Sequence, residues 1–326
     1  MSKTVTKIIL LLFSSTLIFS IDPSTPDDGN LYREISGSFL PNNIVIYDND
    51  SILNESGIVI ENDRLFRSDK KDIDYAIKNR ALGSDISWIN DETFVVLTGN
   101  SDRYSHGILG DNVEATGFEV YDNSSQISNF EVPSNRVFET LRPLIADVIP
   151  ENPGVEIILT SSNHLEGSRI EIYSQEGEFL GNSDSIGRGF RWLHVIAAAP
   201  FSSNSKQYIA IVRTPHINGI LELYFWNGNH LVKEASTGNV STHQIGSDNL
   251  NMALVSNFDS TPGPEFLIPS FDFRSLVIIK YTFGELSEVK RFDLPGRIAT
   301  NIFFDNIQSN SIWVGLANGK IVRLTE

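Results

Sequence analysis

The chain has 326 residues, of which 40% are hydrophobic and 10% aromatic, and its 41 Asp and Glu against 25 Lys and Arg give a net charge of −16. The apolar content is enough for a large packed core, whereas the acidic balance argues against a nucleic acid as partner, because phosphate binding depends on an excess of Lys and Arg. The absence of cysteine excludes disulfide bonds and a lipid-modified N-terminal cysteine.

Residues 1–20 have the pattern of a secretory signal peptide. Two lysines precede an apolar run at residues 8–19, and Ser20 is a small residue at the expected cleavage position. The run is short and interrupted by serine and threonine, which favours a cleaved signal over the alternative, an uncleaved membrane anchor. Residues 21–30 are polar and contain prolines, which predicts a linker. We therefore expect an exported protein, periplasmic or extracellular, without stable membrane insertion after cleavage.

From residue 31 to the C-terminus, the chain repeats a unit of roughly 50 residues. Four units divide into four short apolar runs each, at residues 84–131, 143–183, 192–236 and 252–292. Four short strands per unit at this period are typical of a β-propeller. We predict an all-β fold with one β-propeller domain over residues 31–326, built from about six four-stranded blades, with seven as the alternative. The second runs align on one apolar column, formed by Ile46, Leu97, Leu159, Ile211, Ile268 and Val314.

The last unit has only three apolar runs, at residues 300–306, 311–317 and 320–326. Its outer edge would be an unpaired strand, which propellers avoid by closing the ring. We predict that residues 31–40 supply the missing strand. Residues 42–49, 56–62 and 64–68 would then belong to the first blade, and residues 70–80 would bridge two blades.

Two segments carry a recurring pattern of strand, turn and strand: RPLIADVIPENPGVEIILTSS (142–162) and MALVSNFDSTPGPEFLIPSFD (252–272). In each, an apolar strand ends in an acidic turn, and Val-Glu or Pro-Glu opens a second apolar strand. These segments resemble the FG-GAP/VCBS type of propeller repeat. Residues 188–259 also resemble uncharacterised exported bacterial members of that group, a similarity that implies no known reaction.

In FG-GAP/VCBS-type repeats, the turn between the first two strands often binds calcium through oxygens at alternate positions. The turn at 257–265 departs from the pattern, because Pro262 stands where a glycine is expected, and the turn at 147–156 has Ile149 where a carboxylate belongs. Ordinary β-turns without metal are the competing interpretation, so no cofactor is expected and calcium is a weak candidate. Its ligands would be Asn257, Asp259, Thr261 and Glu265.

Antiparallel blades place two kinds of loop at the same end: those joining the second to the third strand, and those joining one blade to the next. Five of the six histidines fall in or beside such loops (106, 164, 194, 216 and 243), and only His230 falls at the other end. Eight arginines follow the same rule. Arg presents a planar fork suited to carboxylate or phosphate, and His can donate, accept or carry charge. In an acidic protein, this end would be a focused positive site.

We expect this end to bind an anionic or sugar-like small molecule or another exported protein. Trp192, Phe190 and Phe273 would form a stacking wall. The competing interpretation gives these side chains structural roles, such as pairing with acids. The alternative function is a propeller hydrolase, lyase or dehydrogenase acting on a carbohydrate-like substrate in the same funnel, with catalytic residues unassigned. A third is a scaffold with an apolar patch on its rim. The ligand-binding candidates are Arg191, His194, Arg213, His216, His243 and Arg274.

Overall fold

The computed structural model describes residues 43–48, 58–61, 64–67, 77, 79–122, 125–259, 261–305 and 311–325. Within these ranges the chain forms 23 β-strands and no helix, so no described helix is long and apolar enough to cross a membrane. The all-β prediction is confirmed. The expected signal peptide and linker, residues 1–30, lie outside the described part.

The described strands form six antiparallel sheets. The first complete sheet contains β4 (Ile86–Trp88), β5 (Thr93–Thr98), β6 (Gly117–Asp122) and β7 (Ser125–Glu131). The next contains β8 (Val137–Phe138), β9 (Leu144–Ala146), β10 (Glu156–Asn163), β11 (Gly167–Ser174) and β12 (Phe179–Asn182). The third contains β13 (Leu193–Ala199), β14 (Tyr208–Arg213), β15 (Ile220–Trp226) and β16 (Leu231–Thr237).

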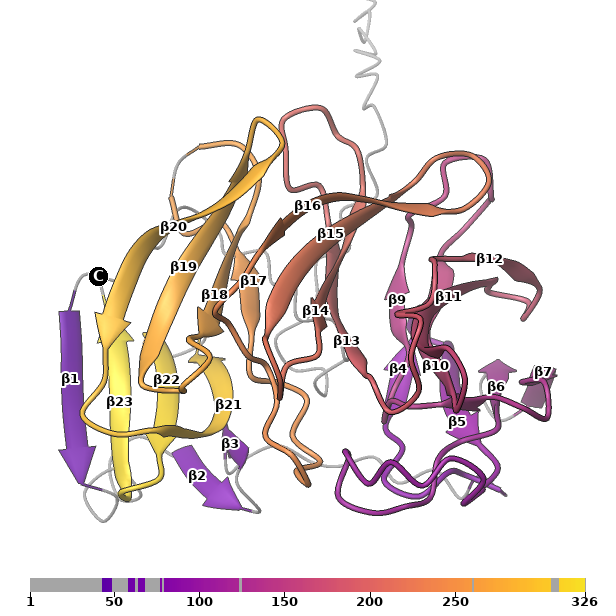
Figure 1. Ribbon diagram of the computed structural model, residues 1–326, viewed down its shortest axis with the longest axis horizontal. Helices are drawn as coiled ribbons and strands as arrows, with labels where there is room; N and C mark the ends of the chain where they lie inside the picture. Colours follow the sequence, from indigo (N-terminus) through magenta and orange to yellow (C-terminus); the bar gives the residue numbers. More distant parts are fainter. Residues whose placement is uncertain are drawn as a thin grey trace, which may run out of the picture.

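The fourth complete sheet contains β17 (Leu254–Ser256), β18 (Glu265–Pro269), β19 (Ser275–Thr282) and β20 (Glu285–Asp293). The fifth contains β21 (Ile298–Asp305), β22 (Ser311–Leu316), β23 (Lys320–Thr325) and, at its outer edge, β1 (Asn43–Asp48). A two-stranded hairpin of β2 (Ile58–Glu61) and β3 (Arg64–Arg67) lies against β21 and β22. The sheets follow one another in chain order around the molecule (Figure 1), an arrangement consistent with a β-propeller-like fold.

An N-terminal strand completes the C-terminal sheet, as predicted, but it is not the expected segment. β1 pairs antiparallel with β23, from Asn43 opposite Thr325 to Asp48 opposite Lys320. The assignment of residues 42–49 to the first blade was therefore wrong, while residues 31–40 lie outside the described part. The alignment on Ile46 could not separate a second strand from an edge strand, because both are short apolar runs.

The cores lie between neighbouring sheets. One cluster joins β13–β16 to β17–β20, and Phe201 stacks on Phe266 within it with ring centroids 4.4 Å apart. Other clusters join β17–β20 to β21–β23, β4–β7 to β8–β11, and β8–β12 to β13–β16. Alternation along each strand sends side chains to both faces, and both faces of a central sheet are covered. Each of the three central sheets, β8–β12, β13–β16 and β17–β20, therefore packs against two neighbours.

Three successive third strands repeat the pattern Glu-x-Tyr, which places a carboxylate and a phenol on the same face of the strand. The tyrosine hydroxyl donates to the glutamate in each case, at 2.5 Å for Tyr121 to Glu119, 2.6 Å for Tyr173 to Glu171 and 2.9 Å for Tyr224 to Glu222. Glu171 and Glu222 are buried. Since buried carboxylates are costly without partners, the nearby cations that neutralise them are structural groups.

Candidate functional site

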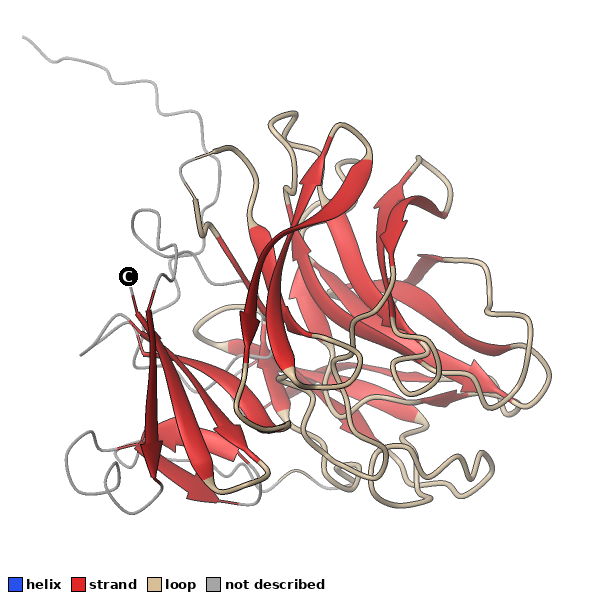
Figure 2. Ribbon diagram, turned by 60° about the vertical axis from the view of Figure 1, so that its left-hand side comes forward, coloured by secondary structure: helices blue, strands red, loops and turns tan. Residues whose placement is uncertain are grey.

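We call the loop face the end of the molecule formed by the loops between second and third strands and by the connections between sheets. Figure 2 shows many of these long loops at the lower end of the sheets. Its largest element is the cap loop, residues 99–116, which joins β5 to β6. Gly246, in the connection after β16, donates its backbone N–H to the carbonyl of Ile108 at 3.0 Å. The cap loop therefore reaches from the β4–β7 sheet to the far side of the β13–β16 sheet.

The cap loop is held down by an apolar cluster at the middle of the loop face. Ile108 and Leu109 from the loop pack with Leu141, Trp192 and Leu250, which come from three different connections. All five side chains are buried. The predicted funnel is therefore filled at this level by side chains of the protein itself.

Trp192 lies at the centre of a histidine cluster. Its ring stacks on His194, with centroids 5.1 Å apart and planes at 13°, and on His216, at 5.9 Å and 8°. His243 meets the ring edge-on at 5.0 Å. The indole Nε1–H donates to the backbone carbonyl of Glu139 at 2.9 Å. Three of the predicted ligand-binding residues are thus brought together, around a buried tryptophan that was expected to be a stacking wall.

The tautomers of two of these histidines follow from their partners. The carbonyl of Ser247 only accepts, so His243 carries its proton on Nε2, 2.7 Å away. His243 Nδ1 is then an acceptor, and His216 Nε2–H donates to it at 2.8 Å. A second proton on His243 would break this chain. His243 is therefore neutral in this arrangement.

The pKa values of the cluster agree with neutral rings. Burial lowers the pKa of His194 well below its usual value. Burial, together with the charge that His243 would carry, lowers the pKa of His216 to about 3. Burial also lowers the pKa of His243 to about 4, against the raising effects of the Ser247 carbonyl and Asp248. These histidines add no positive charge at neutral pH, which removes part of the expected anion site.

The predicted arginines do not converge. Arg213 lies 3.0 Å from the buried Glu222 and so neutralises a structural carboxylate. Arg191 donates to the neighbouring carbonyl of Phe190 at 2.8 Å, and Arg274 is exposed. Phe273, expected in the stacking wall, is a core residue beneath the guanidinium of Arg297. Only the histidine part of the predicted set therefore forms one site.

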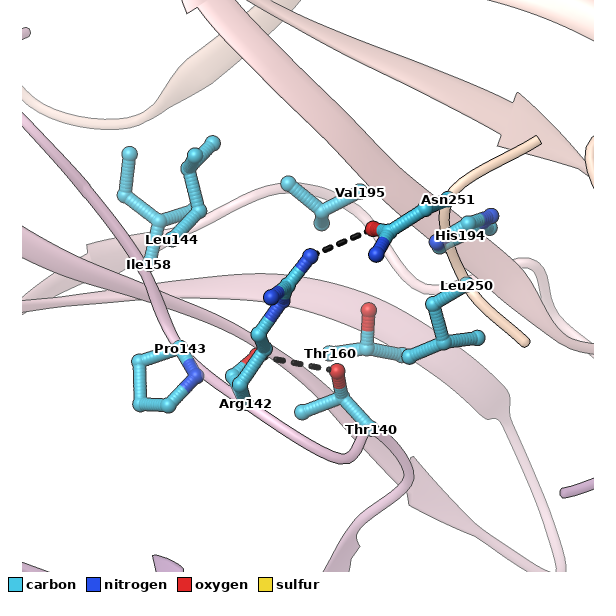
Figure 3. A pocket seen from close by; sticks show the side chains of 10 residues that line it. All are labelled: Thr140, Arg142, Pro143, Leu144, Ile158, Thr160, His194, Val195, Leu250 and Asn251. Carbon is cyan, nitrogen blue, oxygen red and sulfur yellow. Dashed lines mark hydrogen bonds between the residues drawn. The ribbon is translucent and has the colours of Figure 1, made fainter. Parts of the chain in front are cut away.

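Beside the histidine cluster lies a small polar cavity of about 20 Å³, with room for about one water molecule. Arg142 projects into it and donates to the side-chain oxygen of Asn251 (Figure 3). His194 and Thr160 also line it. A cavity of this size does not accommodate a sugar.

A second group of polar residues lies under the start of the cap loop. His106 Nδ1 is 2.5 Å from Glu139 Oε1, and the other oxygen of Glu139 accepts the hydroxyl of Ser162 at 2.5 Å. Glu139 is fully buried. It occupies the interruption between β8 and β9, which both pair with β10, at Ser161–Ser162 and Glu156–Ile158 respectively. The apolar run at residues 143–149 begins after this break, so the pattern of apolar runs did not reveal it.

The carboxyl of Glu114, at the end of the cap loop, is also buried, and its Oε1 has no hydrogen-bond partner in the described part of the chain. Burial, then the nearby charges of Glu139 and Asp111, raises the pKa of Glu114 to about 9. Glu114 is therefore protonated at neutral pH, close to the carboxyl of Glu139.

The sequence did not point to Tyr104 or Glu114 as site residues. It offered Glu139 only as an acid that could pair with an Arg or His of the loop face, and the structure shows such a pair with His106. The only other signal was the apolar pair Ile108–Leu109 inside an otherwise polar loop of unusual length, since long loops in compact domains are often functional.

The calcium candidates lie in a turn that is bridged by a lysine. The ammonium of Lys280 lies 3.1 Å from both oxygens of Asp259 and also donates to Glu265. Glu265 further accepts the backbone N–H of Phe258 at 2.7 Å. The Lys280 ammonium lies between the two carboxylates, in the position that a metal ion would need. The residues present therefore do not fit calcium. The described residues contain no cluster of three or more metal-ligating side chains.

Changing Lys280 to Met is expected to lower the free energy of unfolding by about 1–3 kcal/mol, because Glu265 would keep a buried, partly unpaired carboxylate. Urea unfolding measures this loss, with Lys320→Met as control, since Lys320 makes no ion pair within the part of the chain that the structure describes. Calcium is expected to leave the unfolding midpoint of the unmodified protein unchanged. A calcium-dependent rise in that midpoint would contradict the assignment of Lys280 as the turn's cation.

No protein-family model matches the chain, and the search of curated proteins found no match either. The resemblance to FG-GAP/VCBS-type repeats therefore stays a prediction.

Proposed function

We propose that this protein is an exported β-propeller of six blades, closed by β1, that binds another protein with its loop face. The observation that carries the proposal is the distribution of exposed apolar side chains. Ten large hydrophobic residues of the described part are exposed, and six of them belong to the loop face, each from a different loop or connection. They are Leu82, Leu165, Phe190, Ile217, Ile245 and Phe271.

Contiguous exposed apolar surface on a soluble protein is characteristic of interaction sites. Leu165 is 83% exposed and Ile245 is 71% exposed. Some of these side chains are neighbours, because the loop carrying Leu165 contacts the connection before Phe190, and Phe271 lies against Gly219 beside Ile217. A partner surface can cover several of them together.

Charge does not select the partner further, because arginines and acids are both exposed on the loop face. Arg188 and Arg274 are exposed there, and neither makes an ion pair within the described ranges. Asp102, Asp111, Glu166, Asp184 and Asp272 are exposed there as well, so the net charge of −16 does not distinguish the loop face from the hairpins at the opposite end. Seven exposed acids lie there: Asp91, Glu92, Asp147, Glu151, Glu176, Glu178 and Glu285.

A small anionic or sugar-like ligand is less well supported. The cavity beside His194 holds about one water molecule, and the histidines around Trp192 are neutral. A larger cavity of about 180 Å³ lies between the ends of β5, β6 and β7, lined by Thr98, Asn100 and Glu119 among others. It contains none of the predicted ligand-binding residues.

The test places a photo-crosslinking amino acid at positions 165, 217 and 271, one at a time, in the full chain in its own cells. The control position is 283, because Phe283 is fully exposed at the opposite end. We expect one common protein to crosslink at all three loop-face positions and not at 283. Its purified form should bind a Leu165→Glu/Ile217→Glu/Phe271→Glu variant at least 100-fold more weakly, and a Phe179→Glu/Phe283→Glu variant unchanged. Equal crosslinking at 283, or no common partner, would overturn the proposal.

A further inference from the structure

His106 and Glu139 have the geometry of a carboxylate–imidazole pair that is held for proton transfer. Glu139 Oε1 accepts a hydrogen bond from His106 Nδ1 at 2.5 Å. The proton of the neutral ring is thereby fixed on Nδ1, which leaves a lone pair on Nε2. His106 Nε2 makes no hydrogen bond within the described residues. The side chain of His106 is 15% exposed and that of Glu139 is 0% exposed, so within this pair only the imidazole reaches the surface.

Glu139 is held from several directions. Its second oxygen accepts from Ser162 at 2.5 Å and lies 3.3 Å from Ser168 Oγ. Its backbone N–H donates to Thr160 at 3.0 Å, and its carbonyl accepts from Trp192 at 2.9 Å. Such support around a carboxylate is what keeps a catalytic pair in a productive geometry.

The second carboxyl near this pair is kept neutral. The pKa of Glu114 is raised to about 9 by burial and by the charge of Glu139. Because Glu114 is protonated at neutral pH, it adds no second negative charge beside the carboxyl of Glu139, which contacts His106 directly.

An apolar wall stands beside the exposed edge of His106. The ring of Phe190 stacks on Tyr104, with centroids 5.2 Å apart, and lies edge-on to His106 at 5.5 Å. Phe190 is 41% exposed, and its backbone is in the left-handed region with φ 52°. The Tyr104 hydroxyl accepts the N–H of Phe190 at 2.9 Å, which stabilises this unusual conformation. Strained backbone that is held by a specific contact is common beside functional groups.

We propose that His106 and Glu139 form a general-base pair that hydrolyses carboxylic esters whose apolar acyl or aryl group lies against Phe190. His106 Nε2 takes a proton from water while the water oxygen forms a bond to the ester carbonyl carbon. The tetrahedral intermediate then breaks its bond to the alcohol oxygen, which takes the proton back from His106. The products are a carboxylic acid and an alcohol, and His106 is regenerated. Positioned general bases contribute about 10²–10⁴-fold to a rate. This activity does not depend on the proposed protein partner.

The test uses p-nitrophenyl acetate and p-nitrophenyl butyrate with the full chain. We expect multiple turnovers, without an initial burst of p-nitrophenol, because water and not the protein attacks the ester. His106→Asn should lower kcat/KM by at least about 10²-fold. His230→Gln is the matched control and should change nothing, since His230 is exposed in the β15–β16 turn at the other end.

Glu139 is a positioning residue, so its variant needs a readout beyond rate. Glu139→Gln should move the midpoint of the pH–rate profile to lower pH, because the imidazolium loses its carboxylate. Tyr104 and Phe190 contact the ring of His106, and His216 lies close enough for the two imidazole charges to interact; all three are kept constant. Near-ultraviolet circular dichroism and the unfolding midpoint of each variant show whether it is folded. Ser162→Ala, which removes one hydrogen bond to Glu139, is a milder second variant with the same expected direction.

Three results would overturn the proposal: no turnover above the uncatalysed rate, equal turnover by folded His106→Asn, or a single burst of one equivalent without turnover. The last would show acylation of a side chain and not base catalysis.

Discussion

Replacing Arg136 with alanine is expected to lower the free energy of unfolding by about 3–5 kcal/mol, the range for removing one partner of a buried ion pair. Arg136 is 4% exposed. Its Nε donates to the hydroxyl of Ser161 at 2.6 Å and its Nη2 to the Ser161 carbonyl at 2.9 Å. The same Nε lies 3.6 Å from the buried carboxylate of Glu171.

The expected loss has three sources. Alanine leaves the Ser161 carbonyl without its donor, places Glu171 beside an emptied space, and removes the contact to Glu166 at 3.0 Å. Arg169 remains 2.6 Å from Glu171, which limits the cost to the lower part of the range. Arg136 also precedes β8, so its loss weakens the start of the strand that positions Glu139.

The matched control is Arg291→Ala. Arg291 and Glu288 form a close pair at 2.5 Å, but both side chains are 41% exposed. Exposed pairs contribute about 0–1 kcal/mol, so this variant should unfold nearly as the unmodified protein does. Urea unfolding with a common slope for all three proteins provides the comparison. An equal loss in the two variants would show that burial of Arg136 does not decide its contribution.

Much of the sheet organisation could be predicted, because it depends on local patterns that repeat. The apolar columns around Leu159, Ile211 and Ile268 are buried second strands. The sorting of loops by blade geometry also placed five histidines at one end, and His194, His216 and His243 meet there. Period and loop order need no knowledge of distant contacts, which is why sequence reasoning sufficed for these features.

The chemistry of the site could not be predicted in the same way. Whether Glu139 faces a histidine or solvent depends on the break between β8 and β9. Whether the funnel is open depends on where the cap loop ends, and that is decided by Ile108 meeting Trp192 from another sheet. Arg213 was predicted to bind a ligand because its position in a loop could be read from the sequence. Its ion pair with Glu222 on the next strand could not be read in that way. Contacts of this kind join residues that are far apart in the chain, and they produce no repeating pattern in the sequence.

The lowered pKa values of the histidine cluster should make the stability of the protein depend on pH. Unfolded histidine has a pKa of about 6.5, whereas the folded pKa values are about 3 for His216 and about 4 for His243. The unfolded chain therefore binds more protons below pH 6.5, and stability falls as the pH falls toward 4. At pH 5 the cost is about 2 kcal/mol for each histidine relative to pH 7.5, since one pKa unit is about 1.36 kcal/mol.

Glu114 acts in the opposite direction. Its folded pKa of about 9 is above the unfolded value of 4.5, so the folded chain holds a proton that the unfolded chain releases. Stability from this group is full below pH 4.5 and is lost as the pH rises toward 9. The loss between pH 5 and pH 7.5 is about 3 kcal/mol by the same conversion. In the unmodified protein, the effects of the buried histidines and of Glu114 therefore oppose each other and partly cancel.

Substitutions that remove one effect at a time should separate them. In Glu114→Gln, which cannot ionise, the unfolding free energy should rise by about 4 kcal/mol from pH 5 to pH 7.5 through His216 and His243 together. His194, whose folded pKa is also lowered, adds to this rise. Adding His216→Asn and His243→Asn should remove the part of about 4 kcal/mol and leave the part due to His194, whereas adding His230→Gln should leave the whole rise. Urea unfolding at pH 5, 6 and 7.5 measures each slope, and NMR titration of the imidazole Cε1–H signals gives the pKa values directly. If His216 and His243 titrate near 6.5 in the folded protein, the cluster around Trp192 is open to water. The cap loop then does not close the centre of the loop face.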